Sequence, residues 1–365
     1  AYEILRCLVG SEMCRRDSDQ LSEAELKSII DTAGKIKANP ADYMECCHGK
    51  IMATLFYEPS TRTQMSFQAA MMRLGGKVIG FSDPGSSSVS KGETLKDTVR
   101  IVSAYADLVV IRHPKEGAAY AASLYSRKPV INAGDGGHLH PTQTLTDLVT
   151  LSHEKGTLSG LTIGICGDIK NGRTVHSLVK CLSKYNDNKF VLISTPELQS
   201  PQYIKDILNA SGCKYFFCNT LEEAMPYLDV LYMTRIQQER FSSKEEYERQ
   251  KGVYVLDRAK LSLAKKDLKI LHPLPRVDEI TNEVDDDPRA KYFQQAEYGM
   301  YARMALIMNM IEKGKDIIPP KSESTHSVCC TNPSCITAHE GYLPHLFKEN
   351  GDMLVCKYCD DRILF

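Results

Sequence analysis

The sequence predicts an α/β protein with two doubly wound parallel-sheet domains, followed by a small cysteine-rich domain. Between residues 50 and 293, short runs rich in Val, Ile and Leu alternate with amphipathic segments, a pattern typical of parallel sheets covered by helices. A turn-rich stretch at 155–160 precedes a fresh apolar run, which fits a domain boundary. Five of the 13 cysteines lie in the last 37 residues, which indicates a separate C-terminal unit.

The alternating pattern predicts a definite set of elements. The expected strands are 51–57, 77–81, 107–112, 129–133, 161–167, 189–194, 214–218, 229–234, 253–256 and 269–272. The expected helices include 62–74, 94–105, 141–153, 173–185, 201–211 and 291–312. Because helices fall between most of the strands, we expect parallel sheets with helices on both faces.

The chain is expected to have four parts. Pro319 and Pro320 lie in a polar cluster that ends the long helix before them, which is typical of a linker. The expected parts are a first domain at 1–150 completed by the C-terminal helix at about 291–313, a second domain at 151–290, a linker at 314–325, and a last domain at 326–365.

The bulk composition narrows the class of protein. A formal net charge of −1 and a pI near 6.9 give no reason to expect a nucleic acid or a membrane as a partner. No segment approaches the ~20 consecutive apolar residues of a transmembrane helix. The first residues lack a basic region followed by an apolar stretch, so we expect no signal peptide and a cytoplasmic protein.

The most informative motif joins a strand, a turn and a helix. Pro59 follows the apolar run 51–57, blocks its continuation and presets the turn. Ser60 or Thr61 can then cap the next helix. The apolar face expected for that helix consists of Met65, Ala69, Met72 and Leu74.

The turn itself is a candidate anion site. Three hydroxyls, one guanidinium and the N–H groups of a first helical turn converge there, from Ser60, Thr61, Arg62 and Thr63. Backbone donors, the helix dipole and a planar arginine fork all favour a compact dianion such as phosphate. The alternative is a hydroxyl-rich helix cap with an exposed arginine.

Three more loops of the first domain place polar side chains after apolar runs. The small polar loop 83–93 puts Lys91 near another helix N-terminus, although it could be a surface excursion. Arg112 ends a strongly apolar strand, where open α/β sheets bind ligands, although a solvated arginine is an even alternative. His140 and Gln143 follow a glycine-rich turn and could jointly donate to a carbonyl.

The second domain also has polar groups that directly follow apolar runs. Arg173 opens a helix after the strand 161–167, and Arg235 ends the apolar run 229–234. Two arginines at strand ends could clamp a ligand with two carboxylates, whereas either one alone would be a surface arginine. A third apolar run ends at His272-Pro273-Leu274-Pro275-Arg276.

Four cysteines of the tail have the spacing of a closed metal site. Four residues separate Cys330 from Cys335, two separate Cys356 from Cys359, and 20 lie between the pairs. Such thiolates suit tetrahedral Zn²⁺, so we predict a zinc-binding domain in which the metal is structural. A redox pair at Cys356 and Cys359 is an alternative, and Cys329 could replace Cys330.

Together the motifs of the first two domains resemble those of the aspartate transcarbamoylases. Seven of them occur in the family's order over residues 50–310. They are Ser60-Thr61-Arg62-Thr63, Ser88-Val89-Ser90-Lys91-Gly92-Glu93, Arg112-His113-Pro114, His140-Pro141-Thr142-Gln143, Gly172-Arg173-Thr174-Val175-His176-Ser177, Tyr232-Met233-Thr234-Arg235-Ile236-Gln237 and His272-Pro273-Leu274-Pro275-Arg276. Ornithine transcarbamoylases typically show His-Cys-Leu-Pro in the last motif, so aspartate is the expected second substrate.

The resemblance implies a division of the substrates between the domains. The first domain would bind carbamoyl phosphate, with its phosphate on Ser60, Thr61, Arg62 and Thr63. The carbamoyl group would meet Arg112, which also bridges to the phosphate, together with His140, Gln143 and the backbone carbonyls of Leu274 and Pro275. The second domain would bind the two carboxylates of L-aspartate through Arg173, Arg235 and Gln237.

The implied reaction is carbamoylation of the α-amine of aspartate, which gives N-carbamoyl-L-aspartate and phosphate in de novo pyrimidine biosynthesis. The amine attacks the carbonyl carbon and forms a tetrahedral oxyanion. Positioning and electrostatic stabilisation by Arg62, Thr63, Arg112 and His140 would drive the reaction. No cofactor is expected for catalysis.

The resemblance also implies a homo-oligomer with shared active sites. Lys91 and a serine of the same loop would reach into the site of a neighbouring subunit, making the active unit a trimer or a multiple of trimers. Both Ser87 and Ser88 suit the serine's role, and Ser88 is preferred.

The cysteine tail is similar to the zinc domain of the separate regulatory chain that some aspartate transcarbamoylases have. The linker leaves no room for the family's nucleotide-binding domain, so feedback through that domain is not expected. The tail is expected to bridge catalytic chains. Three other functions stay open: an ornithine-type carbamoyltransferase, an inactive homologue acting as an assembly scaffold, and a zinc-dependent nucleic-acid binder, which the tail's mixed charge supports poorly.

Overall fold

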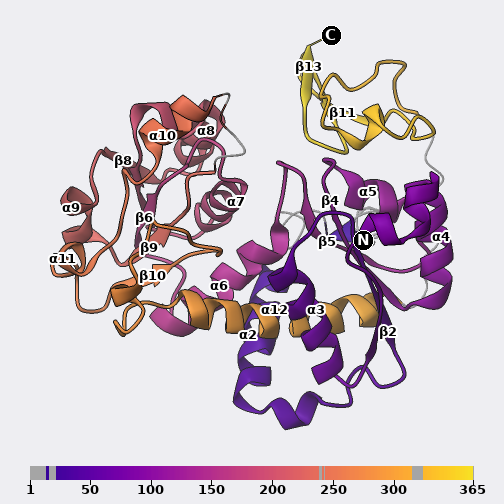
Figure 1. Cartoon of the computed structure of the whole chain (residues 1–365), viewed down its shortest axis with the longest axis horizontal. Coiled ribbons are helices and arrows are strands. Elements are labelled where there is room, and N and C mark those ends of the chain that lie inside the picture. The colour runs from indigo at the N-terminus through magenta and orange to yellow at the C-terminus, as the bar shows by residue number, and fades with distance from the viewer. Residues whose placement is uncertain (1–13, 16–21, 238–240, 242, 315–323, 365) are drawn as a thin grey trace. The chain divides into compact units, whose positions relative to one another are not determined.

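The computed structural model describes residues 14–15, 22–237, 241, 243–314 and 324–364. The chain forms two compact units: unit 1 comprises Ala1–Thr142 and Met300–Phe365, and unit 2 comprises Gln143–Gly299. It passes between them within the long helices α6 (Pro141–Lys155) and α12 (Tyr292–Lys313), both marked in Figure 1. Each unit holds a parallel sheet with helical connections, and a small cysteine-rich domain follows, so the predicted fold class is confirmed.

Unit 1 is built on a five-stranded parallel sheet in the order β1-β5-β4-β2-β3. Its strands are β1 (Cys14–Arg15), β2 (Ile51–Phe56), β3 (Lys77–Phe81), β4 (Leu108–His113) and β5 (Val130–Asp135). Its helices are α2 (Glu23–Ala38), α3 (Thr61–Arg73), α4 (Leu95–Tyr105) and α5 (Ala118–Ser123), together with the 3₁₀ turns η2 (Pro40–Tyr43), η3 (Pro84–Ser86) and η4 (Ser88–Lys91). Strands β2, β4 and β5 are buried almost throughout, as a parallel sheet covered on both faces requires.

Helix α3 begins after Ser60, as the sequence predicts, and Leu74 is buried as expected, but the two methionines of the expected apolar face are not. Met65 and Met72 are 64% and 58% exposed, while Phe67, Ala70 and Met71 are fully buried. The buried positions repeat at spacings of three and four residues, which is the period of one helical face, and Met65 and Met72 lie off that face. The exposed methionines therefore contribute little to the core of this unit.

Unit 2 has a second five-stranded parallel sheet in the order β10-β9-β6-β7-β8. Its strands are β6 (Thr162–Cys166), β7 (Lys189–Ile193), β8 (Lys214–Cys218), β9 (Val230–Met233) and β10 (Lys269–Leu271). Its helices include α7 (Arg173–Leu182), α8 (Gln202–Ala210), α9 (Leu221–Ala224), α10 (Lys244–Gln250) and α11 (Arg258–Leu261), and its 3₁₀ turns are η5 (Pro196–Leu198), η6 (Met225–Tyr227) and η8 (Asn282–Val284).

The predicted strand at 253–256 is wrong. Only Leu256 pairs there, in an isolated bridge to Ile280. Tyr254 and Leu256 are buried in the hydrophobic cluster beside β9 and β10. The apolar residues of this segment pack into that cluster without forming a strand. Hydrophobic periodicity alone does not distinguish such packing from a strand.

The tail forms a small antiparallel sheet that shares a core with the rest of unit 1. Strands β11 (Phe347–Asn350), β12 (Met353–Cys356) and β13 (Arg362–Leu364) pair in that order, and the turn η9 (Ile336–Ala338) precedes them. Phe347 and Tyr358 are buried in one cluster with Ala118 and Ala122 of α5. Because so short a domain buries little surface alone, this shared core contributes much of its packing.

None of the described helices combines the length and the apolar character that crossing a bilayer would require.

Candidate functional site

The polar groups predicted in unit 1 follow four neighbouring strands. Ser60 occupies the N-cap position of α3 after β2 without a side-chain cap bond, Arg112 lies near the end of β4, His140 follows β5, and Lys91 belongs to η4 after β3. Strand order reverses between β2 and β4, because β3 lies on one side of β2 and β4 and β5 on the other. Ligands of open α/β sheets bind at the carboxyl ends beside such a switch point, where the Ser60 turn and Arg112 are.

Arg62 and Arg112 form a doubly cationic pair at this switch point. Arg112 is buried to 8% exposure, whereas Arg62 is exposed. Burial lowers the pKa of Arg62, and the charge of Arg112 lowers it further. Two guanidiniums that repel each other without a ligand would gain by sharing an anion, so the pair favours a phosphate group.

Three neighbours hold the Arg112 side chain in place. Its Nη2 lies 3.0 Å from Oε2 of Glu58, and its Nη1 donates to the Ala133 carbonyl at 3.3 Å. Burial lowers the pKa of Arg112, and the Glu58 carboxylate acts in the opposite direction. Gly134 adopts φ +127°, and a Cβ there would lie 2.9 Å from Arg112 Nη1. The glycine-rich turn therefore leaves space for the guanidinium, a specific reason for glycine at this position.

Thr63 and His140 are buried, and Gln143 belongs to a polar network of unit 2. Thr63 and His140 are each 8% exposed, and His140 directly precedes Pro141, the first residue of α6. Gln143 Nε2 donates to Asp147 Oδ1 at 2.8 Å. The buried Asp147 also accepts hydrogen bonds from Tyr232 Oη at 3.0 Å and from Gln295 Nε2 at 2.6 Å. These bonds fix the orientation of the Gln143 amide.

The serine-lysine loop is largely exposed and makes local hydrogen bonds. Ser88 and Lys91 are exposed, whereas Ser87 is half-buried and its Oγ donates to the Pro84 carbonyl at 2.9 Å. Ser87 Oγ also accepts from the Val89 N–H at 3.3 Å. No hydrogen bond or ion pair within the described ranges joins Ser88 or Lys91 to the arginine pair. Ser87 is used locally, which leaves Ser88 as the better candidate for binding outside the loop.

The predicted groups of unit 2 lie at its own switch point. Strands β6 and β9 are neighbours, and the chain continues to β7 and β8 on one side and to β10 on the other. Arg173 is the first residue of α7 after β6, and Arg235 follows β9. The two loops meet closely, because a Cβ at Gly167 would lie 2.3 Å from the Thr234 carbonyl oxygen. Arg173, Arg235 and Gln237 are all half-buried, which suits contact with a ligand.

The loop after β10 is held by a histidine and an arginine. His272 Nδ1 accepts the Leu274 N–H at 2.8 Å, so its Nε2 donates to Glu279 Oε1 at 2.7 Å. The Leu274–Pro275 peptide is cis. Arg276 binds Asp285 through both terminal nitrogens and Asn282 through one. These anchors on both sides fix the backbone carbonyls of Leu274 and Pro275.

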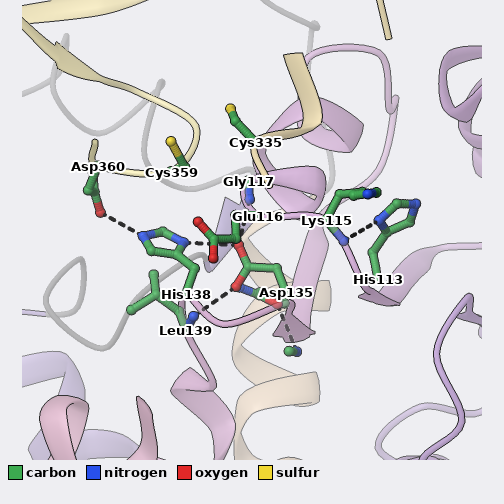
Figure 2. Close-up of polar contacts among 12 residues, drawn as sticks. His113, Lys115, Glu116, Gly117, Asp135, His138, Leu139, Cys335, Cys359 and Asp360 are labelled. Atoms are coloured by element: carbon green, nitrogen blue, oxygen red, sulfur yellow. Dashed lines mark hydrogen bonds and ion pairs between the residues drawn. The ribbon is translucent and has the colours of Figure 1, made fainter. Parts of the chain in front are cut away.

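Sequence reasoning missed a polar hub between the glycine-rich turn and the tail. His138 lies between two carboxylates: its Nδ1 is 3.1 Å from Asp135 Oδ2 and its Nε2 is 3.0 Å from Asp360 Oδ2 (Figure 2). Burial lowers the pKa of His138, but the bonds to Asp135 and Asp360 outweigh it and raise that pKa to about 9. The glycine-rich turn marked the region, but nothing in the sequence linked residues 222 positions apart.

The four predicted cysteines come together in the tail. The Sγ atoms of Cys330, Cys335, Cys356 and Cys359 all lie within 4.8 Å of one another. Cys330 and Cys359 are 3.5 Å apart, and Cys335 and Cys356 are 4.0 Å apart. Four thiolates at ~2.3 Å from Zn²⁺ would be separated by about 3.8 Å, so a tetrahedral metal ion fits. Cys329 is exposed, with Sγ 3.7 Å from His345 Nε2, and is not in the cluster.

Family comparisons cover nearly the whole described chain. Residues 16–153 match the model of the aspartate/ornithine carbamoyltransferase carbamoyl-P binding domain, and residues 159–310 match that of the Asp/Orn binding domain. Residues 323–364 match the metal binding domain of the aspartate carbamoyltransferase regulatory chain.

Individual relatives agree with these matches. The aspartate carbamoyltransferase catalytic subunit of Clostridium novyi is 59% identical over 81% of this chain and 96% of its own length. The catalytic subunit of M. jannaschii aspartate transcarbamoylase is 48% identical with a TM-score of 0.77, over 81% of this chain and 97% of that one. The Trypanosoma cruzi enzyme in complex with carbamoyl phosphate and aspartate is 39% identical with a TM-score of 0.76, over 80% and 95%. The chain therefore belongs to the aspartate carbamoyltransferase family, and it carries at its C-terminus the metal-binding domain of that family's regulatory chain.

Proposed function

We propose that this chain transfers the carbamoyl group of carbamoyl phosphate to the α-amine of L-aspartate, an early step of de novo pyrimidine biosynthesis in the cytoplasm. One observation carries the proposal: two arginines flank the switch point of each sheet, Arg62 and Arg112 in unit 1 and Arg173 and Arg235 in unit 2. One pair suits a phosphate, and the other suits a dicarboxylate.

Carbamoyl phosphate binds to the residues of the first pair and its surroundings. Ser60 and Thr61 start α3, and Ser60 makes no side-chain cap bond, so the hydroxyl and the first N–H groups of the helix can meet the phosphate together with Arg62 and Thr63. Buried Arg112 bridges the phosphate and the carbonyl oxygen. His140, Gln143 and the backbone carbonyls of Leu274 and Pro275 bind the carbamoyl group. The Glu58 carboxylate is the counter-ion that the substrate replaces beside Arg112.

Aspartate binds in unit 2 through Arg173, Arg235 and Gln237. Arginine forks take carboxylates in a bidentate way, so two arginines from neighbouring strands fix both ends of the dianion. Ornithine carries an ammonium group where aspartate carries its side-chain carboxylate, so this pair of arginines repels it. Selection for aspartate follows from charge.

The proposed reaction uses the two substrates and side chains of this protein. The neutral amine of aspartate forms a bond with the carbonyl carbon, and the carbonyl π electrons move to its oxygen. Arg112, Thr63 and His140 stabilise that oxyanion, and Arg62 stabilises the leaving phosphate. When the C–O bond to phosphate breaks, the electron pair leaves with phosphate, which also accepts the amine proton. Charge stabilisation and positioning account for catalysis.

The tail binds one structural Zn²⁺. The sulfur spacing and the four-thiolate donor set support a closed tetrahedral site, and the ion would hold the two cysteine loops together. Three of these cysteines are buried, which is typical of a structural rather than a catalytic site.

The active form is a trimer, or a multiple of trimers, with shared sites. Lys91 and Ser88 are exposed, and within the described residues neither bonds to Arg62 or Arg112 of its own chain, which suits a role in a neighbour's site. Exposed Met65 and Met72 on α3 and Ile79 on β3 supply apolar surface that a neighbouring subunit would cover. The tail is proposed to contact a second catalytic chain in such assemblies.

Complementation tests the shared site. Arg62→Ala and Lys91→Ala chains should each be inactive, and reassembly of a mixture should restore part of the wild-type rate, because some sites then combine two intact halves. No recovery in verified mixed oligomers would contradict the sharing of sites, and the enzymatic proposal would stand.

N-(phosphonacetyl)-L-aspartate, the ligand of a T. cruzi relative, tests the two-anion site. It joins a phosphonate to the two carboxylates of aspartate, so it should inhibit competitively with carbamoyl phosphate and bind more tightly than either substrate. The Arg62→Ala and Arg235→Ala variants should each bind it at least about 100-fold more weakly. Equal binding by both variants and wild type would overturn the site assignment.

A further inference from the structure

We propose that His138 is a positioning residue that connects the cysteine-bearing tail to the loop carrying His140, so that an intact metal centre helps to order the carbamoyl site. This inference rests on the proposed function for its kinetic readout. Its structural readout is independent of activity.

His138 contacts the tail and the first domain at the same time. Its imidazole lies between Asp135 of β5 and Asp360 of the tail, with both ring nitrogens within 3.1 Å of a carboxylate oxygen (Figure 2). Because carboxylates accept hydrogen bonds, both ring nitrogens act as donors. The His138 side chain is only 10% exposed, and that of Asp135 is 1% exposed. The half of this charge-assisted bridge that involves Asp135 is buried, whereas the Asp360 side chain is 43% exposed, and the two bonds together hold the ring from both sides.

Asp135 passes this constraint to the backbone of the site. Its Oδ1 accepts the Leu139 N–H at 3.1 Å and the Asn132 amide at 3.0 Å. Its Oδ2 accepts the Gly117 N–H at 2.8 Å. Leu139 directly precedes His140, and Gly117 lies five residues after Arg112 in the sequence. One carboxylate thus ties the turn that leads to His140 to the connection between β4, which carries Arg112, and α5.

The tail end of the bridge depends on the cysteine cluster. Asp360 follows Cys359 directly, adopts φ 61°, and donates its N–H to the Cys356 carbonyl at 3.0 Å. A metal ion bound to Cys356 and Cys359 would hold this turn, and with it the Asp360 carboxylate. Release of the metal would free the turn, and His138 would lose one of its two partners.

A second contact between tail and domain makes the bridge testable by itself. Asn332 Nδ2 donates to Glu116 Oε2 at 2.7 Å, and the backbones of Glu116, Ser334 and Ile336 exchange hydrogen bonds at 3.0 and 2.9 Å. Tyr358 packs over Gly117, where a Cβ would lie 2.5 Å from the Tyr358 Cβ. These contacts keep the tail docked when His138 is replaced, so a His138 variant removes the bridge and leaves the interface.

The kinetic test uses full-length, metal-loaded His138→Ala, Asp360→Ala and the double variant. Each single variant should lose about 10- to 100-fold in kcat/KM for carbamoyl phosphate, the usual effect of losing a partner that orients a site, while KM for aspartate changes less than about twofold. The double variant should lose no more than the worse single variant, because both changes break the same bridge. Exposed His48→Ala and Asp352→Ala are the matched controls and should behave as wild type.

Hydrogen exchange and metal content complete the test. Peptides covering Leu139 and Gly117 should exchange faster in both single variants and in chelated wild type, while each variant keeps one metal ion per chain. If the His138→Ala variant showed the same hydrogen exchange and the same kinetics as wild type, the inference would be overturned. Loss of metal from that variant would also overturn it, because His138 would then maintain the tail rather than connect it to the site. If wild type does not carbamoylate aspartate, the proposed function fails, and the exchange data still decide this inference.

Discussion

Gly134 lies against the guanidinium of Arg112, so closely that a Cβ at position 134 would be 2.9 Å from Arg112 Nη1. The other side of the same guanidinium faces Glu58, at 3.0 Å. The buried guanidinium therefore lies between the Glu58 carboxylate and the space that Gly134 leaves open. The geometry of the proposed carbamoyl site therefore depends on a residue without a side chain.

Gly134→Ala should displace Arg112 and lower kcat/KM for carbamoyl phosphate by about 100-fold, since small misplacements of a catalytic group cost that much. The control is Gly156→Ala, which also places alanine at positive φ but meets no atom within 4 Å. Both variants place a Cβ at positive φ, and Gly134→Ala adds the overlap with Arg112, so the free energy of unfolding of each variant is measured beside its activity. Equal activity in the two variants, measured by initial rates, would contradict the role given to Gly134.

Arg62→Ala should reduce kcat by at least about 1,000-fold with little change in stability, because the side chain is exposed and serves the developing phosphate charge rather than the core. Arg73→Ala, an exposed arginine on the same helix, provides the matched control. Circular dichroism and initial rates together separate the two effects. An active Arg62→Ala enzyme would remove the basis for the phosphate assignment.

Asp285 gives a pH prediction for the loop after β10. Its hydrogen bonds from Arg276 lower its pKa below the ordinary value of about 3.9. A carboxylate with a lowered folded-state pKa stabilises the fold above that ordinary value, and the contribution disappears as pH falls through the folded-state pKa. Asp285→Asn should therefore be less stable than wild type in urea unfolding at pH 7, and the difference should shrink below pH 4.

The neighbouring exposed Asp286→Asn is the control for this effect. Its stability relative to wild type should not follow the same course with pH. A difference between Asp285→Asn and wild type that stays constant from pH 7 to pH 3 would show that the ion pair with Arg276 does not stabilise the loop.

Replacing one cysteine should release the metal. Wild type should contain one zinc ion per chain by elemental analysis, and Cys356→Ser should contain much less, because structural zinc supplies on the order of 10 kcal/mol to the folding of small zinc domains. Exposed Cys46→Ser should retain the metal. Zinc-free wild type with a protease-resistant tail would mean that the packing on α5 alone folds this domain.

Much of the fold was predictable because parallel sheets have a strong local signal. Buried strands such as 51–57 appear as continuous apolar runs, and the turns after them carry the site residues. The segment at 253–256 shows the limit: its burial depends on Ile280 and the cluster around it, which no local pattern reveals. The apolar face of α3 failed for a related reason, since exposed methionines resemble core residues in the sequence.

The candidate site shows the same division between local and distant information. Arg62, Arg112 and the four tail cysteines lie in motifs whose residue types and spacing indicate their chemistry. The bridge through His138 joins Asp135 to Asp360, and only the docking of the tail on the first domain brings them together. Contacts of this kind depend on tertiary structure and have no spacing to recognise.

The most direct measurement of the central claim is a competition assay. The purified protein is incubated with carbamoyl phosphate that is isotopically labelled in its carbamoyl group, together with equal concentrations of L-aspartate and L-ornithine. The labelled products are identified by mass spectrometry. The arginine pairs predict label in N-carbamoyl-L-aspartate with an equal amount of phosphate, and none in citrulline. Label in citrulline alone, or no transfer by a metal-loaded and correctly folded chain, would contradict the account.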